Sequence, residues 1–220
     1  MKILVMSCDR NEDLFGPFYL CMEKYWPNHP EIIYSTETIT NPYYKTISKN
    51  IPLDRWTRRV HETIKEIDSD HILMMVDDIF LRRKVDNEFV LSLEQYVQGN
   101  VAAINFEFSF DVEDTEFNDR INRRNPFGTY KLSCMCQLWS KEKMLVLFDV
   151  NRNPWQFESL NQAHGYEYLI SKKGDFLDWG KRPGDWRWGI VQGKWTQENK
   201  EFFDKEGIQI DYGKRGFANV

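Results

Sequence analysis

The stretch Ile72 to Leu81, ILMMVDDIFL, decides the fold class. Its first five residues are apolar, with polar SDH before the stretch and RRK after it. A short apolar run between polar boundaries is typical of a strand that is buried on both faces, as in a parallel sheet. Two adjacent carboxylates, Asp77 and Asp78, follow the run. Because such anions repel each other and resist desolvation, we expect them at the sheet edge, in water or beside a cation.

Strand and helix patterns alternate before this stretch. Residues 2–7 (KILVMS) and 31–36 (EIIYST) predict strands, and residues 17–26 between them have near-helical spacing of apolar side chains. A strongly periodic helix is expected over 54–67, capped by Asp54. This order predicts a parallel sheet, and it places the two carboxylates at the carboxyl end of a central strand, where ligands bind in open α/β sheets.

The remainder of the chain continues the alternation without a repeat or a linker. We expect helices at 86–100, 140–148 and 151–169 and strands at 101–110 and 130–139. Residues 41–52 predict a loop, residues 111–129 a loop or a mobile flap, and the chain from 171 onward an irregular lobe rich in Gly and Trp. The prediction is a single α/β domain in which helices flank a mostly parallel sheet.

Composition narrows the class of protein. The net charge of -5 and the pI near 5.5 argue against non-specific binding to nucleic acid. No apolar run approaches the ~20 residues of a membrane span, and the sequence begins without a signal-peptide pattern, so a cytoplasmic protein is expected. The four cysteines form no CxxC pair, which predicts reduced thiols rather than structural zinc, with Cys134 and Cys136 on one face of a strand.

Aromatic side chains are abundant, at 15% of the chain with 8 Trp. Such a surplus suits stacking on sugars or bases in a cleft, although much of it must belong to the core. At most two of Trp179, Trp186, Trp188 and Trp195 are expected in sugar-stacking walls. A sugar-binding module without catalysis is therefore one alternative.

Five pieces of the sequence carry a resemblance to a known family: MKILVMSCDR, YWPNHP, RWTRRVHETIKEIDSDHILMMVDDIFLRRKVD, NPWQFE and IVQGKW, in this order over most of the chain. On these pieces the sequence resembles bacterial glycosyltransferases of the GT-A fold, akin to the inverting family 2. More narrowly, it resembles small transferases of capsule or surface polysaccharide.

The resemblance implies a hexosyltransferase with two functional halves. Residues 1–110 would bind a nucleotide diphosphate-sugar, most often a UDP-sugar, and 111–220 a glycan or lipid-linked glycan acceptor, which is compatible with a position at the membrane periphery. In that fold an Asp-x-Asp motif contacts the donor ribose and a metal ion. This chain has Val76-Asp77-Asp78 instead. We assign Asp78 to Mg²⁺ or Mn²⁺, which prefer carboxylates, and Asp77 to the ribose or to positioning.

Further donor contacts are expected from three other side chains. Asp9 follows the first strand, where the nucleotide base would lie; its alternative role is to cap the next helix. Arg59 and Lys194 could meet the diphosphate, because a poor leaving group needs cations; Arg215 is a further C-terminal candidate. On the alternative interpretation they are ordinary surface cations.

The segment NPWQFES predicts a helix that begins at Pro154 with Asn153 as its cap. Glu158, one turn in, could simply interact with the helix dipole. With the order of family motifs in view, we favour it as the general base of inverting transfer, and Trp155 as a wall of the acceptor pocket.

A nucleotidyltransferase that makes the activated sugar is the second alternative. That class usually carries an early glycine-rich, basic phosphate loop, which MSCDRNEDLFG lacks.

Overall fold

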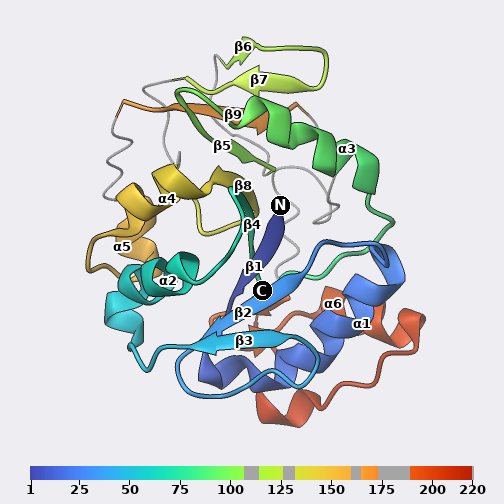
Figure 1. Ribbon diagram of the computed structural model, residues 1–220. Coiled ribbons are helices and arrows are strands. Elements are labelled where there is room, and N and C mark those ends of the chain that lie inside the picture. Colours follow the sequence, from blue (N-terminus) through green and yellow to red (C-terminus); the bar gives the residue numbers. More distant parts are fainter. Residues whose placement is uncertain (107–113, 126–131, 160–164, 173–188, 220) are drawn as a thin grey trace.

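A mixed sheet forms the centre of the computed structural model, which describes residues 1–106, 114–125, 132–159, 165–172 and 189–219 (Figure 1). The nine strands of this sheet follow the order β3-β2-β1-β4-β8-β5-β9-β7-β6. In chain order they are β1 Lys2–Met6, β2 Ile32–Thr36, β3 Lys45–Ser48, β4 His71–Val76, β5 Val101–Asn105, β6 Thr115–Glu116, β7 Ile121–Arg123, β8 Gln137–Ser140 and β9 Glu167–Ser171.

Parallel pairing dominates the half of the sheet that contains β4. Strands β3, β2, β1 and β4 all run in the same direction, with Met6 of β1 opposite Val76 of β4. Strand β8 lies antiparallel between β4 and β5, and β5 pairs parallel with β9. The predicted mostly parallel α/β architecture is confirmed.

Helices cover both faces of the sheet. The α-helices are α1 Phe15–Tyr25, α2 Trp56–Lys65, α3 Asn87–Ser92, α4 Lys141–Phe148, α5 Pro154–Ser159 and α6 Gln197–Glu206. In Figure 1, α2, α4 and α5 lie on one side of the sheet and α1, α3 and α6 on the other. None of the helices in the described ranges is long and apolar enough to cross a membrane.

The apolar run of β4 supplies both cores. Ile72 and Met74 belong to the core beneath α2 and α4, whereas Leu73 and Met75 belong to the core beneath α1 and α3. Successive side chains of a strand point to opposite faces, so a strand covered on both sides must be apolar at every position. This is the physical reason for the run that decides the fold class.

Several predicted elements differ from the structure. Strand β3 lies inside the predicted loop 41–52. Of the predicted helix 151–169, residues 154–159 form α5, whereas 167–169 belong to strand β9. The predicted strand 130–139 becomes regular only at Gln137, so Cys134 and Cys136 lie in bends before it. Strands form in these places because they pair with distant strands, and the local sequence pattern carries no information about such pairing.

Two smaller predictions need correction as well. Helix α2 begins after a 3₁₀ turn, Leu53–Arg55, and Arg55 rather than Asp54 occupies the N-cap without a side-chain bond. Within the predicted flap 111–129, residues 115–116 and 121–123 pair as the antiparallel strands β6 and β7 at the sheet edge. Residues 111–113 and 126–129 of that segment lie outside the described ranges.

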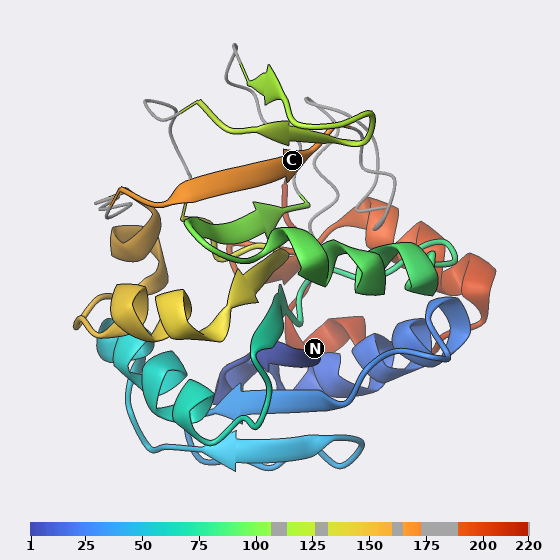
Figure 2. The same ribbon diagram turned by 45° about the horizontal axis from the view of Figure 1, so that its top comes forward.

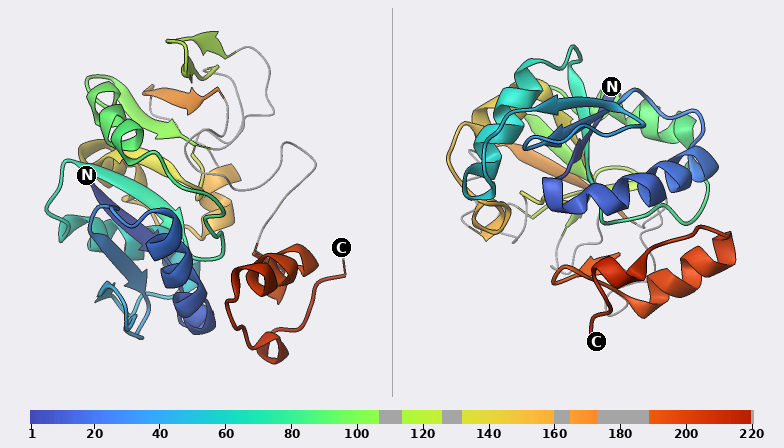
Figure 3. Two further views of the ribbon diagram at one scale, coloured as in Figure 1. Left: turned by 90° about the vertical axis from the view of Figure 1, so that its right-hand side faces the viewer. Right: turned by 90° about the horizontal axis from the view of Figure 1, so that it is seen from below.

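The C-terminal segment, residues 189–219, packs beside α1 (Figures 2 and 3). It contains the hairpin strands β10 Ile190–Val191 and β11 Lys194–Trp195, then α6 and a 3₁₀ turn, Tyr212–Lys214. Trp195 is fully buried and packs against Phe80 and Phe203, with ring centroids 6.1 and 5.8 Å away. Because Phe80 follows the carboxylates of β4, this aromatic cluster joins the C-terminal segment to the end of that strand.

Candidate functional site

The carboxyl ends of β1 and β4 lie side by side, which brings Ser7 next to Asp77. The Ser7 hydroxyl donates to Asp77 Oδ2 at 2.5 Å, and the Asn11 amide donates to Asp77 Oδ1 at 2.8 Å. Asp77 is only 1% exposed. The predicted position of this carboxylate at a strand end is therefore confirmed. Contrary to expectation it is not in water, because the protein encloses it, and its role in donor binding stays a prediction.

Burial controls the protonation of both carboxylates. It raises the pKa of Asp77 to about 7; the charge of Asp78 acts in the same direction, and the hydrogen bonds from Ser7 and Asn11 oppose it. Burial also raises the pKa of Asp78 to about 6, against a hydrogen bond from its own backbone amide and the charge of Arg215. Asp78 is the more accessible of the two, because part of its surface is open to solvent. A cationic ligand at this site would favour the ionised pair.

The C-terminal segment closes directly on the turn after β4. The Gly189 amide donates to the Asp78 carbonyl at 2.9 Å. A Cβ atom at residue 189 would lie 2.3 Å from Phe80 Cε2 and 2.4 Å from the Asp78 carbonyl oxygen. Only glycine permits this approach, so residue 189 is a sequence requirement for docking the segment at the carboxylates.

Arg215 makes the second contact between the C-terminal segment and this end of the sheet. Its Nε and Nη2 atoms donate to the two oxygens of Asp13, both at 2.7 Å. Nη2 also donates to the Arg10 carbonyl at 2.8 Å and to Asn11 Oδ1 at 3.0 Å. The side chains of Arg215 and Asp13 are 9% and 15% exposed. Such a bidentate, largely buried pair holds its geometry better than a solvated ion pair.

Asp9 connects the loops that follow β1 and β2. Its carboxylate accepts hydrogen bonds from the Thr38 amide at 3.0 Å, the Thr38 hydroxyl at 2.5 Å and the Ile39 amide at 3.3 Å. Burial opposes ionisation, but these bonds outweigh it and hold the pKa of Asp9 below its ordinary value. The alternative role of Asp9 as a helix cap is wrong, because Asp9 is the first residue of a 3₁₀ helix, Asp9–Leu14, whose N-cap is Cys8.

Arg59 lies behind the strand ends rather than on the surface. The residue is 1% exposed, donates to the Ser7 carbonyl at 2.6 Å and forms an ion pair with Glu37. Burial lowers the pKa of its guanidinium, while nearby anions oppose this. The solvated-helix interpretation of Arg59 is therefore wrong. In this arrangement its guanidinium supports the backbone at Ser7 instead of facing a ligand.

A second carboxylate site forms at α5. Asn153 caps the helix as predicted, since its side chain accepts from the Gln156 amide at 2.8 Å. The Glu158 carboxylate accepts from the Cys134 amide at 2.7 Å and from the Ser133 hydroxyl at 3.4 Å. Burial raises its pKa, although these hydrogen bonds act in the opposite direction. A carboxyl group with a raised pKa is a better proton acceptor once ionised.

The antiparallel strand β8 places both carboxylate sites at the same edge of the sheet. Gln137 at the start of β8 is opposite Met74 near the end of β4. Residues 132–136, which precede β8, therefore lie at the edge where β4 ends, and Glu158 binds to that segment. The sequence alone does not reveal this, because a parallel strand would have placed the same residues at the opposite edge.

The remaining predicted site residues are solvent-accessible. Trp155 is 66% exposed on α5, and Lys194 is exposed on the hairpin of the C-terminal segment. Trp195 is a core residue and is not available for sugar stacking. Trp179, Trp186 and Trp188 lie outside the described residues. Acceptor and donor contacts of Trp155 and Lys194 stay predictions.

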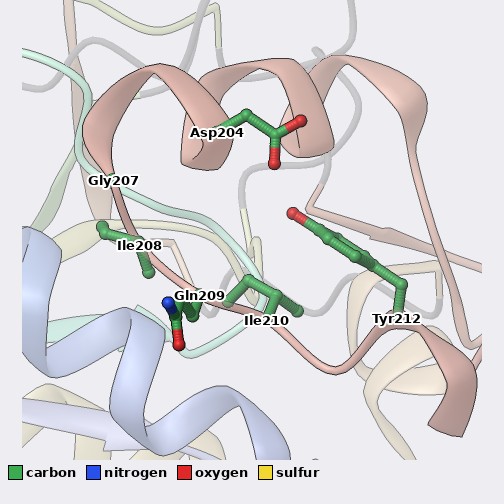
Figure 4. A pocket seen from close by; sticks show the side chains of 6 residues that line it. All are labelled: Asp204, Gly207, Ile208, Gln209, Ile210 and Tyr212. Carbon is green, nitrogen blue, oxygen red and sulfur yellow. The ribbon is translucent and has the colours of Figure 1, made fainter.

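A shallow hollow of about 530 Å³ lies on the C-terminal segment, away from the carboxylates (Figure 4). Figure 4 shows it between α6 and the stretch that follows, with the Tyr212 ring on one side and Asp204 on the other. Its lining is Asp204, Gly207, Ile208, Gln209, Ile210 and Tyr212. None of these residues belongs to the two carboxylate sites.

A divalent cation fits one carboxylate of the site. Over the described residues, no group of three His, Cys, Asp or Glu side chains is arranged to hold a metal ion. Mg²⁺, however, is usually bound by one or two carboxylates, with water and substrate phosphates as the other ligands. Asp78, which is partly open to solvent, suits that mode. Asp77 suits it less, because both its oxygens already accept hydrogen bonds.

Three polar side chains near the ends of β1 and β2 were not found by sequence reasoning: Asn11, Asp13 and Glu37. All three follow the ends of β1 and β2. The rule that applies to the end of β4 applies equally to these neighbouring parallel strands. Polar residues directly after each parallel strand were therefore the available signal.

Solved structures share this fold, although no protein-family model matches the sequence and no curated protein matches it. Residues 1–349 of TarS from S. aureus align with a TM-score of 0.52 and 12% identity, over 80% of this chain and 59% of that one. A longer TarS structure aligns with a TM-score of 0.50 and 10% identity, over 78% of this chain and 35% of that one. A cytidylyltransferase from Leptospira borgpetersenii aligns with a TM-score of 0.49 and 11% identity, over 80% of this chain and 77% of that one. The fold is GT-A-like. The chain spans little more than half of TarS 1–349.

Proposed function

We propose that the protein transfers a monosaccharide from a nucleotide diphosphate-sugar to a carbohydrate acceptor. One observation supports the proposal: buried and partly buried carboxylates, Asp77 with Asp78 and separately Glu158, lie at the same edge of a GT-A-like sheet, where β4 ends. Two carboxylate sites in different environments suit two tasks, namely binding a cationic centre with the donor and accepting a proton.

The reaction would proceed with inversion. The Glu158 carboxylate takes the proton of the acceptor hydroxyl while its oxygen attacks the anomeric carbon of the donor. The bond from that carbon to the diphosphate oxygen breaks, and the nucleoside diphosphate leaves with the bonding electrons. The hydrogen bond from the Cys134 amide orients the Glu158 carboxylate for this step.

Several residues would hold the donor. Asp78 would bind Mg²⁺ or Mn²⁺, which would neutralise the diphosphate as it leaves. Asp77 would position the ribose from below, and Asp9 would shape the side that receives the base. Lys194 would approach the phosphates from the C-terminal segment, while Arg59 would act indirectly by supporting the Ser7 backbone.

Substrates and setting are also part of the proposal. A UDP-sugar is the expected donor, and a glycan or lipid-linked glycan is the expected acceptor, beside Trp155. Synthesis of surface polysaccharide in the cytoplasm, next to the membrane that carries such an acceptor, would suit these substrates. The exposed Trp155 ring offers a face for stacking on an acceptor sugar.

Binding followed by transfer tests the proposal. Thermal unfolding is measured with a series of nucleotide diphosphate-sugars, with Mg²⁺, with Mn²⁺ and with a chelator, because a saturating ligand raises stability by a few kcal/mol. The best donor is then incubated with oligosaccharide acceptors, and both the product and its anomeric configuration are determined. Asp78→Asn is the test variant. Asp68→Asn, an exposed carboxylate before the opposite end of β4, is its control.

The outcomes separate the rival functions. Release of nucleoside diphosphate with formation of a glycoside supports the proposal. Sugar binding without turnover of any donor would indicate a binding module. Formation of a nucleotide-sugar from a sugar phosphate and a nucleoside triphosphate would indicate a nucleotidyltransferase. Either of the last two results overturns the proposal.

A further inference from the structure

The Asn11 side chain bridges a cation and an anion. Its Oδ1 accepts from Arg215 Nη2 at 3.0 Å, and its Nδ2 donates to Asp77 Oδ1 at 2.8 Å. A guanidinium can only donate hydrogen bonds, and an ionised carboxylate can only accept them. The reversed amide would place its NH₂ against the guanidinium and its oxygen against a carboxylate oxygen. The neighbours of Asn11 therefore fix its orientation.

Arg215 is itself held in one position from two directions. Asp13 binds its Nε and Nη2 atoms in a fork, and the Arg10 carbonyl accepts from Nη2. Nη1 points to the Gly193 carbonyl at 3.4 Å, within the C-terminal segment. The guanidinium thus ties the turn of the β10–β11 hairpin to the loop after β1. Docking of the C-terminal segment and orientation of Asn11 depend on the same side chain.

From this chain of contacts we propose that Arg215 is a positioning residue for the carboxylates of β4. It orients the Asn11 amide toward Asp77, so that the donor end of the site is complete only when residues 189–219 are docked. Docking of the same segment also fixes the backbone of Asp78, because the Gly189 amide donates a hydrogen bond to the Asp78 carbonyl. This inference rests on the proposed function only where it concerns donor binding.

The neighbouring Lys214 provides a matched control. Its Nζ lies 3.4 Å from Asp13 Oδ1, but its side chain is 48% exposed, whereas that of Arg215 is 9% exposed. Both residues carry one positive charge near the same carboxylate. Of these two cations, Arg215 is the one that contacts Asn11. A purely electrostatic or anchoring role would be sensitive to both cations, whereas orientation of the amide depends on Arg215 alone.

The first experiment observes the Asn11 side chain directly. The ¹H–¹⁵N signals of its NH₂ group, assigned with Asn11→Ser, are compared in the wild type, Arg215→Ala, Arg215→Lys and Lys214→Ala. We expect these signals to shift and broaden in Arg215→Ala and to remain unchanged in Lys214→Ala. Arg215→Lys keeps the charge but cannot form the two parallel hydrogen bonds to Asp13, so it should also shift the signals. It provides a second test if Arg215→Ala does not fold. Unchanged signals in both folded Arg215 variants would overturn the inference.

The second experiment is a double-mutant cycle with UDP as the probe. Its dissociation constant is measured for Arg215→Ala, Asn11→Ala and the double variant. We expect each single change to weaken binding about tenfold, and the double variant to be no weaker than either, because residues that act through one another are not additive. Additive losses would overturn the inference. If UDP and other nucleoside diphosphates fail to bind the wild type, the proposed function fails, while the NMR comparison still decides the role of Arg215.

Discussion

The end of β4 and helix α5 both hold a carboxylate at one edge of the sheet, but the two sites are built differently. At the end of β4, Asp77 receives hydrogen bonds from residues 66 and 70 positions away, and Arg215 fixes one of these donors from the C-terminal segment. Glu158 is held by a segment only 24 to 25 positions away.

The carboxylate after β4 is held rigidly, whereas the carboxylate on α5 is more accessible to solvent. Asp77 is almost completely enclosed, and its hydrogen-bond donors are fixed by distant parts of the chain, which suits a rigid binding surface. Glu158 retains partial exposure beside the open Trp155, which suits a group that must meet an incoming hydroxyl. Under the proposed function, the end of β4 would determine donor binding and α5 would determine proton transfer, so the two could be changed independently.

The largest effect is expected from Glu158→Gln. Loss of the proton acceptor should reduce the transfer rate by about 10²–10⁴-fold, while donor affinity changes little. The pH profile of the wild type should rise with ionisation of Glu158, at a pH above the usual range for a glutamate, because burial raises its pKa. Steady-state rates measured from acidic to alkaline pH test this.

Glu142→Gln, an exposed carboxylate at the start of α4, serves as the control for Glu158→Gln and should keep wild-type rates. Near-normal transfer by Glu158→Gln, with a lower melting temperature, would show that Glu158 has a structural role only. The contrast between the two regions would then disappear.

Asp78→Asn should have the next largest effect, and it should act on the donor. Removing one group that stabilises developing charge, such as an oxyanion-hole donor, typically costs about 10²–10³-fold in turnover, and we expect a loss of that order here. The fold should be retained, because the amide is nearly isosteric and Asp78 is partly exposed. Titration with Mg²⁺ and Mn²⁺ checks this prediction. Equal activity and equal metal dependence in Asp78→Asn and the wild type would show that Asp78 does not bind the metal ion.

Gly189→Ala should weaken the junction between the C-terminal segment and the end of β4. The added methyl group would overlap Phe80 and the Asp78 carbonyl, and overpacking of this kind costs about 1–3 kcal/mol of stability. We expect a lower melting temperature and a raised KM for the donor. Gly16→Ala in α1 is the control, since its methyl group would lie at an ordinary 3.6 Å from the Tyr43 hydroxyl. Equal melting temperatures for both variants would contradict the tight approach at Gly189.

The last prediction concerns the pH dependence of stability through Asp77. Its pKa of about 7 in the folded protein exceeds the ordinary 3.8, so the folded state binds more protons between these values. The free energy of unfolding should therefore fall as pH rises from about 4 to about 7, by at most about 1.4 kcal/mol per pH unit for one proton. Asp77→Asn should flatten this slope.

Urea unfolding at several pH values, in buffer that contains a chelator, measures the slope. The amide introduced by Asp77→Asn has available partners, because the Ser7 hydroxyl can accept from it and donate instead to the Cys8 carbonyl, 3.4 Å away. Asp68→Asn should keep the wild-type slope. If Asp77→Asn keeps it too, Asp77 is ionised in the folded protein at acidic pH and is not the enclosed group described above.

The two regions were also predictable from the sequence to different degrees. An apolar run with two carboxylates at its end located Asp77 and Asp78, because burial on both faces of a strand leaves a strong local pattern. The helix cap at Asn153 is similarly local. In contrast, β9 pairs with β5 and β7, and only this pairing converts the end of the predicted helix 151–169 into a strand. The role of Asn11 depends on Arg215, whose position no local pattern specifies.

The ion pair between Asp13 and Arg215 also has a consequence for the order of folding. It joins residues 202 positions apart, whereas Ile3 of β1 pairs with Ile32 of β2, much nearer in the chain. Closing a longer loop costs more chain entropy, and contacts distant in sequence form late. We therefore expect refolding to restore the sheet before the carboxylate end is complete, with ligand binding recovering later than secondary structure. A chain still being synthesised would carry a formed sheet before the surroundings of Asp77 are complete.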